Sequence, residues 1–503
     1  MKSIGTIICD DHGPTTSEFT FVVTSSETVP VRRGQMVQVE TEEGLMLAVV
    51  QEVVKTNRFY YHAEAVKELE KSGRTLSSIF PCDRWDMLIA TAKPLGVLKG
   101  GLFDKITFPP SPGDKVYLAE REVLSKFFGF DEENGLEIGF MKFHNVPVKL
   151  NMTRLLQKHL AILAMSGSGK SYLATVLIEE ILSRKKEEGR IFVLVVDVHG
   201  EYVALSQDES WGLAHAVTVV KGPYVQFATP LLTERHLGMF QPEMSPVQMR
   251  ELGRLLSEVR KDKGFAYSLS DVISFIEKDE RMNPRTKEAL LGWLYELEDT
   301  QLFGVEENPH LPEIAKPGRA AVLDLSETLS LRKKQMIVAY VLQRLFDLRR
   351  RNLIPPTLIV LEEAHQFCPE AKQELAISKS VIETIAREGR KFYCSLCLIS
   401  QRPVRLATSV LSQANTHIIL RITNPNDLRA IELSSEMITR EVLGMIAELP
   451  VGEALIVGSA VNAPLFLKVR KKKSSLSVYE ESMEEAAKRF EQGEVNHPYT
   501  SAT

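Results

Sequence analysis

A short loop rich in glycine and serine separates an apolar strand from a helix about one third of the way along this 503-residue chain. We predict the strand at 159–164 and the helix at 171–184, and residues 164–171 read Ala-Met-Ser-Gly-Ser-Gly-Lys-Ser. Gly167 and Gly169 let the backbone curl so that several N–H groups face one anion, and the start of the helix adds a partial positive charge. This order of strand, loop and helix predicts an α/β fold that holds phosphate at a P-loop.

The loop supplies groups suited to a nucleoside triphosphate and its metal ion. Lys170 can reach the β- and γ-phosphates, and the Ser171 hydroxyl suits Mg²⁺, so ATP and Mg²⁺ are the expected ligands. Ala164 replaces the first glycine of the usual G-x-x-x-x-G-K-[ST] pattern and is small enough to keep the turn. The residues expected to bind the nucleotide here are Ser166, Gly167, Ser168, Gly169, Lys170, Ser171 and Tyr172.

Two adjacent acids end a second apolar strand, predicted at 357–361. A P-loop enzyme needs a carboxylate for Mg²⁺ and a group that orients the attacking water. We expect Glu362 to be the carboxylate on the metal side and Glu363 to polarise the water. The carboxyl edge of a parallel sheet is where open α/β folds bind ligands, so these acids and the P-loop are expected to converge there.

Polar residues also follow two other predicted strands. Asp197 and His199 come after the strand at 190–196, and Gln401 comes after the strand at 392–400. Gln401 is expected to act as a γ-phosphate sensor, because its amide can report the third phosphate to the next loop. Asp197 is expected in the nucleotide site, with helix capping or loop hydrogen bonding as the alternative, and that alternative is stronger for His199.

The chain divides by pattern into a β-rich N-terminal part and a longer part in which strands alternate with helices. Short apolar segments between glycine and proline turns predict a small barrel or sandwich in the first part, with one helix around 63–72. The alternation that follows predicts a mainly parallel sheet with a helical insertion. The expected parts are a barrel at 1–145, an ATPase core at 146–232 and 310–470, an inserted helical subdomain at 233–309 and a tail at 471–503.

Composition excludes some classes of protein. The formal net charge of −5 excludes a uniformly basic coat for nucleic acid, but not a local basic channel, because net charge averages over the whole surface. No apolar run approaches the about 18 residues of a membrane helix. Five cysteines in the whole chain, and two acids among the first eleven residues, favour a cytoplasmic protein without a signal peptide.

Together the motifs resemble the archaeal HerA family of DNA helicases and translocases. The resemblance covers nearly the whole chain, including an N-terminal barrel. The segments that carry it, besides the P-loop, are His-Leu-Ala-Ile-Leu-Ala at 159–164, Asp-Val-His-Gly-Glu-Tyr at 197–202, Glu-Glu-Ala-His at 362–365, Ile-Ala-Arg-Glu-Gly-Arg-Lys-Phe at 385–392, Ser-Gln-Arg-Pro at 400–403, Leu-Ser-Gln-Ala-Asn-Thr at 411–416 and Val-Gly-Glu-Ala at 451–454.

The resemblance implies a RecA-like ATPase, related to FtsK-type DNA pumps, that forms a homo-hexameric ring with ATP between subunits. It also implies that duplex DNA passes through the ring pore without sequence dependence, and that a NurA-type nuclease is the partner in resecting DNA ends for recombinational repair.

Several single residues match family positions. Arg390 matches the arginine finger that acts on the neighbour's nucleotide, and Gly389 before it is expected to end a helix. Arg387 is the weaker candidate because Glu383 offers it an i−4 ion pair. The remaining matches near the nucleotide are Lys158, Lys468 and Val469.

Two other functions remain open on the sequence alone: a pumping ATPase of a membrane secretion or conjugation complex, and a nucleotide-dependent scaffold. No local patch predicts the DNA contacts. The candidates for the pore side are Arg402, Arg405, Lys372 and Lys379.

Overall fold

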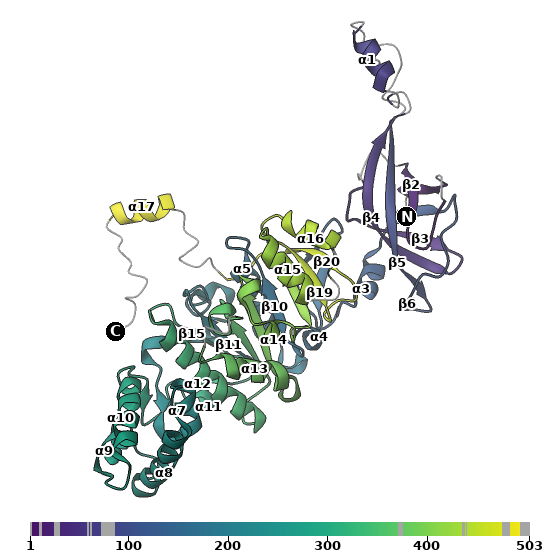
Figure 1. Cartoon of the computed structure of the whole chain (residues 1–503). Helices are drawn as coiled ribbons and strands as arrows, with labels where there is room; N and C mark the ends of the chain where they lie inside the picture. The colour runs from purple at the N-terminus through teal and green to yellow at the C-terminus, as the bar shows by residue number, and fades with distance from the viewer. Residues whose placement is uncertain are drawn as a thin grey trace. The chain divides into compact units, whose positions relative to one another are not determined.

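The computed structural model describes residues 3–9, 13–24, 31–57, 60, 63–71, 86–370, 376–434, 438, 440–474 and 483–492. The chain forms two compact units, which Figure 1 colours along the sequence. The first unit comprises Met1–Glu132 and Phe140–Pro147, and the second comprises Glu133–Gly139 and Val148–Thr503.

Six strands of the first unit close into a barrel, which confirms the predicted N-terminal fold. They follow the order β2-β1-β7-β3-β4-β5, and pairing of β2 with β5 closes the ring. Alternate side chains point inward, so Phe19, Phe21, Val37 and Val39 are at most 1% exposed. The strands are β1 (Gly5–Ile8), β2 (Phe19–Val23), β3 (Met36–Thr41), β4 (Gly44–Thr56), β5 (Met87–Lys99), β6 (Leu102–Asp104), which pairs with β5, and β7 (Lys115–Leu118).

Strand β5 was not predicted, because Pro94 and Gly96 interrupt its apolar pattern and normally weaken a strand. In the structure the two residues lie at a shift in the pairing with β4, between Leu47 and Ala48. A β-bulge is one of the few places where proline is tolerated in a sheet, and it also bends the strand. The expected helix is confirmed as α1 (Ala63–Lys71), although Ser72 lies outside the described residues.

The second unit is built on an 11-stranded sheet whose central strands are parallel, as predicted. Its order is β12-β15-β11-β16-β17-β10-β18-β19-β20-β8-β9, and β19 pairs antiparallel with both neighbours. Strands buried on both faces are continuous apolar runs, as in Phe192–Asp197. The strands are β8 (Leu136–Met141), β9 (Pro147–Leu150), β10 (Leu160–Leu163), β11 (Phe192–Asp197), β12 (Val217–Lys221), β15 (Ala320–Asp324), β16 (Thr357–Leu361), β17 (Cys394–Ser400), β18 (Thr416–Ile419), β19 (Glu453–Gly458) and β20 (Leu465–Val469).

Helices connect these strands, and four of them gather beside α12 in Figure 1 as α7–α10. Every helix in the described part of the chain is too short or too polar to span a lipid bilayer. The longer helices of this unit are α5 (Lys170–Leu182), α7 (Glu234–Phe240), α8 (Pro246–Lys263), α9 (Leu269–Lys278), α10 (Pro284–Glu298), α12 (Leu331–Arg350), α13 (Lys379–Glu388), α15 (Pro425–Ser434), α16 (Arg440–Ala447) and α17 (Met483–Glu491).

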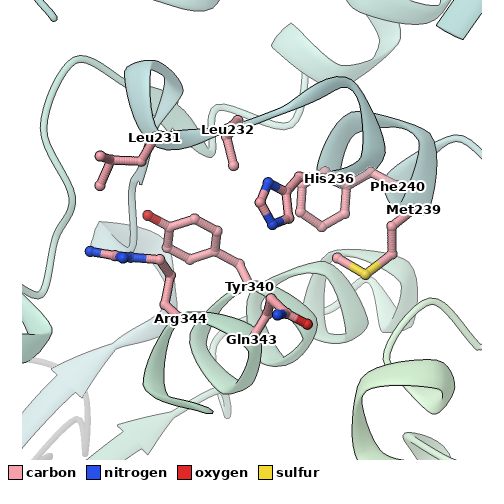
Figure 2. A pocket seen from close by; sticks show the side chains of 8 residues that line it. All are labelled: Leu231, Leu232, His236, Met239, Phe240, Tyr340, Gln343 and Arg344. Carbon is pink, nitrogen blue, oxygen red and sulfur yellow. The ribbon is translucent and has the colours of Figure 1, made fainter. Parts of the chain in front are cut away.

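An aromatic stack joins the α7–α10 helices to α12. Tyr340 of α12 stacks on Phe227 with ring centroids 4.2 Å apart, and Phe227 stacks in turn on Phe240 of α7 at 5.5 Å. Figure 2 shows Tyr340 and Phe240 lining a cavity of about 10 Å³, which is room for one water molecule at most. Arg344, on the same wall, is ion-paired with Glu307. The joint therefore fixes these helices on α12 and offers no space for a substrate.

A buried histidine beside β10 makes stability depend on pH. His417 of β18 is 2% exposed, and burial lowers its pKa to about 4, whereas an unfolded histidine titrates near 6.5. The stabilising effect of neutral His417 is complete above pH 6.5 and is lost as the pH falls towards 4, because only the unfolded chain takes up the proton in that window.

We therefore expect His417→Phe to flatten the pH dependence of unfolding. The free energy of unfolding of the unmodified chain should fall by about 2 kcal/mol more than that of the variant between pH 8 and pH 5. Chemical denaturation at both pH values measures this difference. Identical losses in the two proteins would contradict the assignment.

Candidate active site

The P-loop has the backbone geometry that its sequence predicts. Gly169 caps α5 with φ of 98°, and Gly167 has φ of 74°, conformations that favour glycine. The Ser168 hydroxyl, however, donates to Met165 O at 2.6 Å, and Ser168 is only 3% exposed. Its side chain therefore holds the loop closed, whereas Ser166 is exposed on the loop surface.

Lys170 lies between the two acids that follow β16. Its Nζ is 3.7 Å from Glu362 Oε1 and 3.4 Å from Glu363 Oε1, and both carboxylates are buried. Burial alone would lower the pKa of Lys170, but the charges of Glu362 and Glu363 outweigh it and raise that pKa. The predicted convergence of P-loop and acids at the carboxyl edge is thus present in the structure.

Glu363 is held in a strained and specific position. Its backbone has φ of 47°, a left-handed conformation that costs a residue other than glycine about 1–2 kcal/mol. Gln401 Nε2 donates to Glu363 Oε1 at 2.8 Å, and His365 Nδ1 lies 3.4 Å from Glu363 Oε2. Gln401 therefore contacts the site through Glu363 and not through the P-loop. This hydrogen bond also links the carboxyl ends of β16 and β17.

The Asp197 carboxylate makes the loop hydrogen bonds that the sequence analysis gave as the alternative to a place in the nucleotide site. Its carboxylate is fully buried and accepts four backbone N–H groups, from residues 199–202, at 2.7–3.2 Å. Oδ1 accepts three of these bonds and Oδ2 accepts one, so Asp197 shapes the turn after β11. His199 contributes its backbone N–H to this turn and leaves its side chain exposed. Loop hydrogen bonding is therefore observed, and a place for Asp197 in the nucleotide site stays a prediction.

The site fits a magnesium ion with ATP. Glu362 Oε2 accepts the Val198 N–H at 3.0 Å, whereas Oε1 is buried without a hydrogen-bond partner among the described residues. Burial and the nearby charges of Asp197 and Glu201 raise the pKa of Glu362 well above its usual range. A cation beside Oε1 would relieve both costs, and a carboxylate with the Ser171 hydroxyl is a hard-oxygen donor set that suits Mg²⁺.

The protein alone does not complete a metal site. Within the described ranges, no group of three or more His, Cys, Asp or Glu side chains could hold a metal ion. Phosphate oxygens would have to supply the remaining ligands, as is usual for Mg²⁺ at a nucleotide.

Arg390 and Lys158 lie at the edge of the sheet opposite to the P-loop. Lys158 precedes β10, and Arg390 precedes the parallel strand β17, whereas the P-loop follows β10. The structure therefore does not bring either side chain to the phosphate site of its own chain. Arg390 is exposed, and its side chain has no hydrogen-bond or ion-pair partner among the described residues.

The structure confirms one detail of the arginine prediction and contradicts another. Gly389 caps the end of α13, as expected, with φ of −55°; glycine is needed there because a Cβ would lie 2.2 Å from Cys394 O. Glu383 accepts a bond from Ser409 Oγ at 2.8 Å, and no ion pair between Glu383 and Arg387 occurs in the described part of the chain. The side chains of Arg387 and Arg390 are both exposed, so ion pairing gives no reason to prefer one of them as the arginine finger.

Lys468 and Val469 end β20 at the same edge as the P-loop, but three strand spacings, about 14 Å, separate β20 from β10. Lys468 is exposed, and the Val469 N–H donates to Gly452 O at 2.9 Å. Tyr172 of α5 is engaged with the chain that follows β20, because its hydroxyl accepts the Lys472 N–H at 2.8 Å. Lys468 and Val469 are therefore not brought to the phosphates within one chain, whereas the backbone of Tyr172 lies in the first turn of α5, beside the P-loop.

Sequence reasoning missed His365 and Ser400, which complete the setting of Glu363. His365 Nδ1 lies 3.2 Å from Ser400 Oγ, and Ser400 Oγ accepts the Arg402 N–H at 3.1 Å. Their positions beside the acids and Gln401 in the sequence were the available signal. Arg470 was also missed: it is 8% exposed and forms ion pairs with Glu179 and Glu180 of α5.

Comparison with known proteins agrees with this geometry. Residues 136–345 match the family model for the central domain of helicase HerA. The chain is 30% identical to a DNA double-strand break repair helicase HerA of Sulfolobus acidocaldarius over 79% of this chain and 81% of that one. It is 27% identical to the enzyme of that name from Pyrococcus furiosus over 87% of each chain. Among solved structures, VirB4 of Thermoanaerobacter pseudethanolicus has a similar fold, with 16% identity, a TM-score of 0.51 and coverage of 70% of this chain and 99% of that one.

Proposed function

This chain belongs to the HerA family of DNA helicases, and on that premise we propose that it is an ATP-driven motor that moves duplex DNA. The observation that carries the proposal is the cluster at the carboxyl edge of the sheet, where Lys170, Glu362, Glu363 and Gln401 meet the P-loop. These are the groups that ATP hydrolysis requires at a P-loop.

Each side chain has a distinct task in this proposal. Lys170 and the P-loop N–H groups bind the phosphates, and Ser171 and Glu362 hold Mg²⁺, which would neutralise charge on the phosphate oxygens. Glu363 orients the attacking water and takes its proton. Gln401 donates a hydrogen bond to Glu363 at 2.8 Å and so fixes the carboxylate before ATP binds. We propose that this amide then senses the γ-phosphate.

Assembly into a homo-hexameric ring is part of the proposal. Arg390 and Lys158 lie at the sheet edge opposite to their own P-loop, which supports a role in the site of a neighbouring subunit. In such a ring, the P-loop edge of each subunit would face the opposite sheet edge of the neighbouring subunit. Residues of two chains would then surround every nucleotide. Lys468 and Val469 are proposed to reach a nucleotide in the same way.

DNA is proposed to pass through the ring beside two loops that the structure ties together. The N–H of Glu370 donates to Arg405 O at 2.8 Å, which links the loop after β16 to the loop after β17. Arg402 and Arg405 are the proposed phosphate contacts on these loops. Lys379 is a poorer candidate, because its Nζ donates to Pro369 O at 2.7 Å, and Lys372 lies outside the described residues.

Stimulation of ATP hydrolysis by DNA tests the proposed function. We expect linear duplex DNA to raise the ATPase rate strongly, with a steep loss of stimulation as salt rises, because contacts to phosphates release counterions. Closed circular duplex is the matched control for a requirement for ends. A rate unchanged by DNA would favour the two other functions, a pumping ATPase for a different cargo or a nucleotide-dependent scaffold.

The N-terminal barrel is proposed to organise the ring and receive a NurA-type nuclease, so that the complex resects DNA ends for repair. Residues 133–139 belong to the second compact unit, and Arg470 Nε donates to Glu137 O at 2.9 Å, so a truncation meant to preserve the ATPase unit should keep these residues. A chain that begins at residue 133 should bind ATP normally but lose the nuclease.

A chain that begins at residue 146 is the comparison for this truncation. It lacks β8 and should melt at a lower temperature than the chain from residue 133, because β20 keeps β19 but loses its other neighbour in the sheet. Pull-down of the nuclease and thermal melting measure the two effects. Undiminished capture of the nuclease by the chain from residue 133 would locate the docking face elsewhere.

A further inference from the structure

His159 lies at the start of β10, at the sheet edge opposite to the P-loop. It immediately precedes β10, is 3% exposed and has φ of 63°, a left-handed conformation that is costly for histidine. Five residues later the same strand has entered the P-loop at Ala164. A buried polar side chain on a strained backbone is stable only if hydrogen bonds hold it in place.

Both ring nitrogens of His159 are hydrogen-bonded to the segment that carries Arg390. The N–H of Leu396 donates to Nδ1 at 2.9 Å, so Nδ1 is unprotonated and Nε2 carries the proton. Nε2 in turn donates to Ala386 O at 2.9 Å. One imidazole therefore bridges the last turn of α13 and strand β17, the two ends of the segment in which Arg387 and Arg390 lie.

Two further contacts hold this segment between its ends. Arg349 of α12 is 8% exposed, and its guanidinium donates from Nε to Phe392 O at 2.6 Å and from Nη1 to Ile354 O at 2.7 Å. Gly389 packs so closely on Cys394 O that no side chain would fit. The exposed Arg390 thus projects from a turn that is held by His159, by Arg349 and by the close packing of Gly389.

We propose that His159 is a positioning residue for hydrolysis in the neighbouring subunit: it fixes the turn that presents Arg390 to the nucleotide held by the next P-loop. The inference rests on the proposed function, in which Arg390 acts between subunits. Because His159 begins the strand that ends in the P-loop, the same residue links a subunit's own nucleotide site to the arginine that it offers to its neighbour.

The substitution His159→Phe tests this role, because it keeps a ring of similar size while removing both hydrogen bonds. A shift of about 1 Å in a catalytic group can cost 10²-fold, so we expect kcat of the assembled protein to fall by about 10–100-fold. ATP binding and KM should change little, since the P-loop of the same chain is intact. His417→Phe is the matched control: it makes the same change at a buried histidine on the adjacent strand β18, away from this turn, and should keep full activity.

Mixed rings separate a positioning role from a general loss of structure. His159→Phe subunits mixed with Glu363→Gln subunits should regain activity, because the intact turn of the second kind serves the intact site of the first. His159→Phe subunits mixed with Arg390→Ala subunits should not rise above the reduced rate of His159→Phe rings, because every turn is then defective. If His159→Phe does not assemble, His159→Gln, whose amide can still bond to Ala386 O, replaces it in the same mixtures.

The outcomes distinguish this inference from its premise. Full activity of His159→Phe rings, or equal recovery in both mixtures, would overturn the role of His159. Failure of exchanging Arg390→Ala and Glu363→Gln subunits to restore each other would instead overturn the action of Arg390 between subunits.

Discussion

Replacing Glu363 with glutamine is expected to leave ATP binding intact and to lower turnover by about 10²-fold or more. Glutamine keeps the size of the side chain and can still bond to Gln401, but it cannot accept a proton from the attacking water. Lys170→Ala should instead lose much of both binding and turnover, because Lys170 is placed to hold the phosphates. Nucleotide titration and steady-state hydrolysis measure the two effects separately.

Two other acids serve as controls for the Glu363 assignment. Glu201→Gln also removes a negative charge that acts on Lys170, but Glu201 does not bond to Gln401, so turnover should stay near normal. Glu362→Gln should weaken the binding of Mg²⁺, so that more Mg²⁺ is needed for half-maximal turnover. The turnover at saturating Mg²⁺ should change less. Normal turnover in Glu363→Gln, with loss only in Glu362→Gln, would reverse the roles of the two acids.

Arg390→Ala is expected to lower turnover even further, since an arginine finger acting between subunits is worth about 10³–10⁵-fold. The Arg390 guanidinium has no hydrogen-bond or ion-pair partner among the described residues, so the substitution should leave thermal stability unchanged. Mixing Arg390→Ala with Glu363→Gln subunits should restore part of the activity, because some interfaces then contain both intact groups. Hydrolysis is measured across mixing ratios, after subunit exchange has been demonstrated.

Arg387→Ala is the control for this prediction, because Arg387 is equally exposed and lies one turn earlier on the same segment. It should keep most of the activity. A larger loss in Arg387→Ala than in Arg390→Ala would transfer the role to Arg387. Absence of any recovery in exchanging mixtures would show that the arginine acts within its own chain.

The parts of the site that were predictable are those encoded by neighbouring residues. The P-loop, the paired acids after β16 and Gln401 after β17 each follow a continuous apolar strand, and parallel strands bring their carboxyl ends to one edge. The barrel was predictable because its short strands alternate between inward and outward side chains. Periodicity and the P-loop pattern were sufficient for these features.

The rest depends on contacts that local sequence does not encode. Asp197 has the residue type and position of a ligand, yet four N–H groups of its own turn surround the carboxylate. Pro94 and Gly96 hid β5, because a bulge that tolerates them depends on the partner strand. No local pattern marked Arg470 as a buried residue, yet it packs against the acids of α5 and forms an ion pair with Glu179.

Displacement of a triplex-forming strand tests the central claim most directly, since a motor that travels along duplex DNA strips such a strand from its path. The account predicts displacement that requires ATP, starts from a free duplex end and is absent with Glu363→Gln rings. Rings that hydrolyse ATP at a rate stimulated by DNA, but never displace the third strand, would contradict translocation.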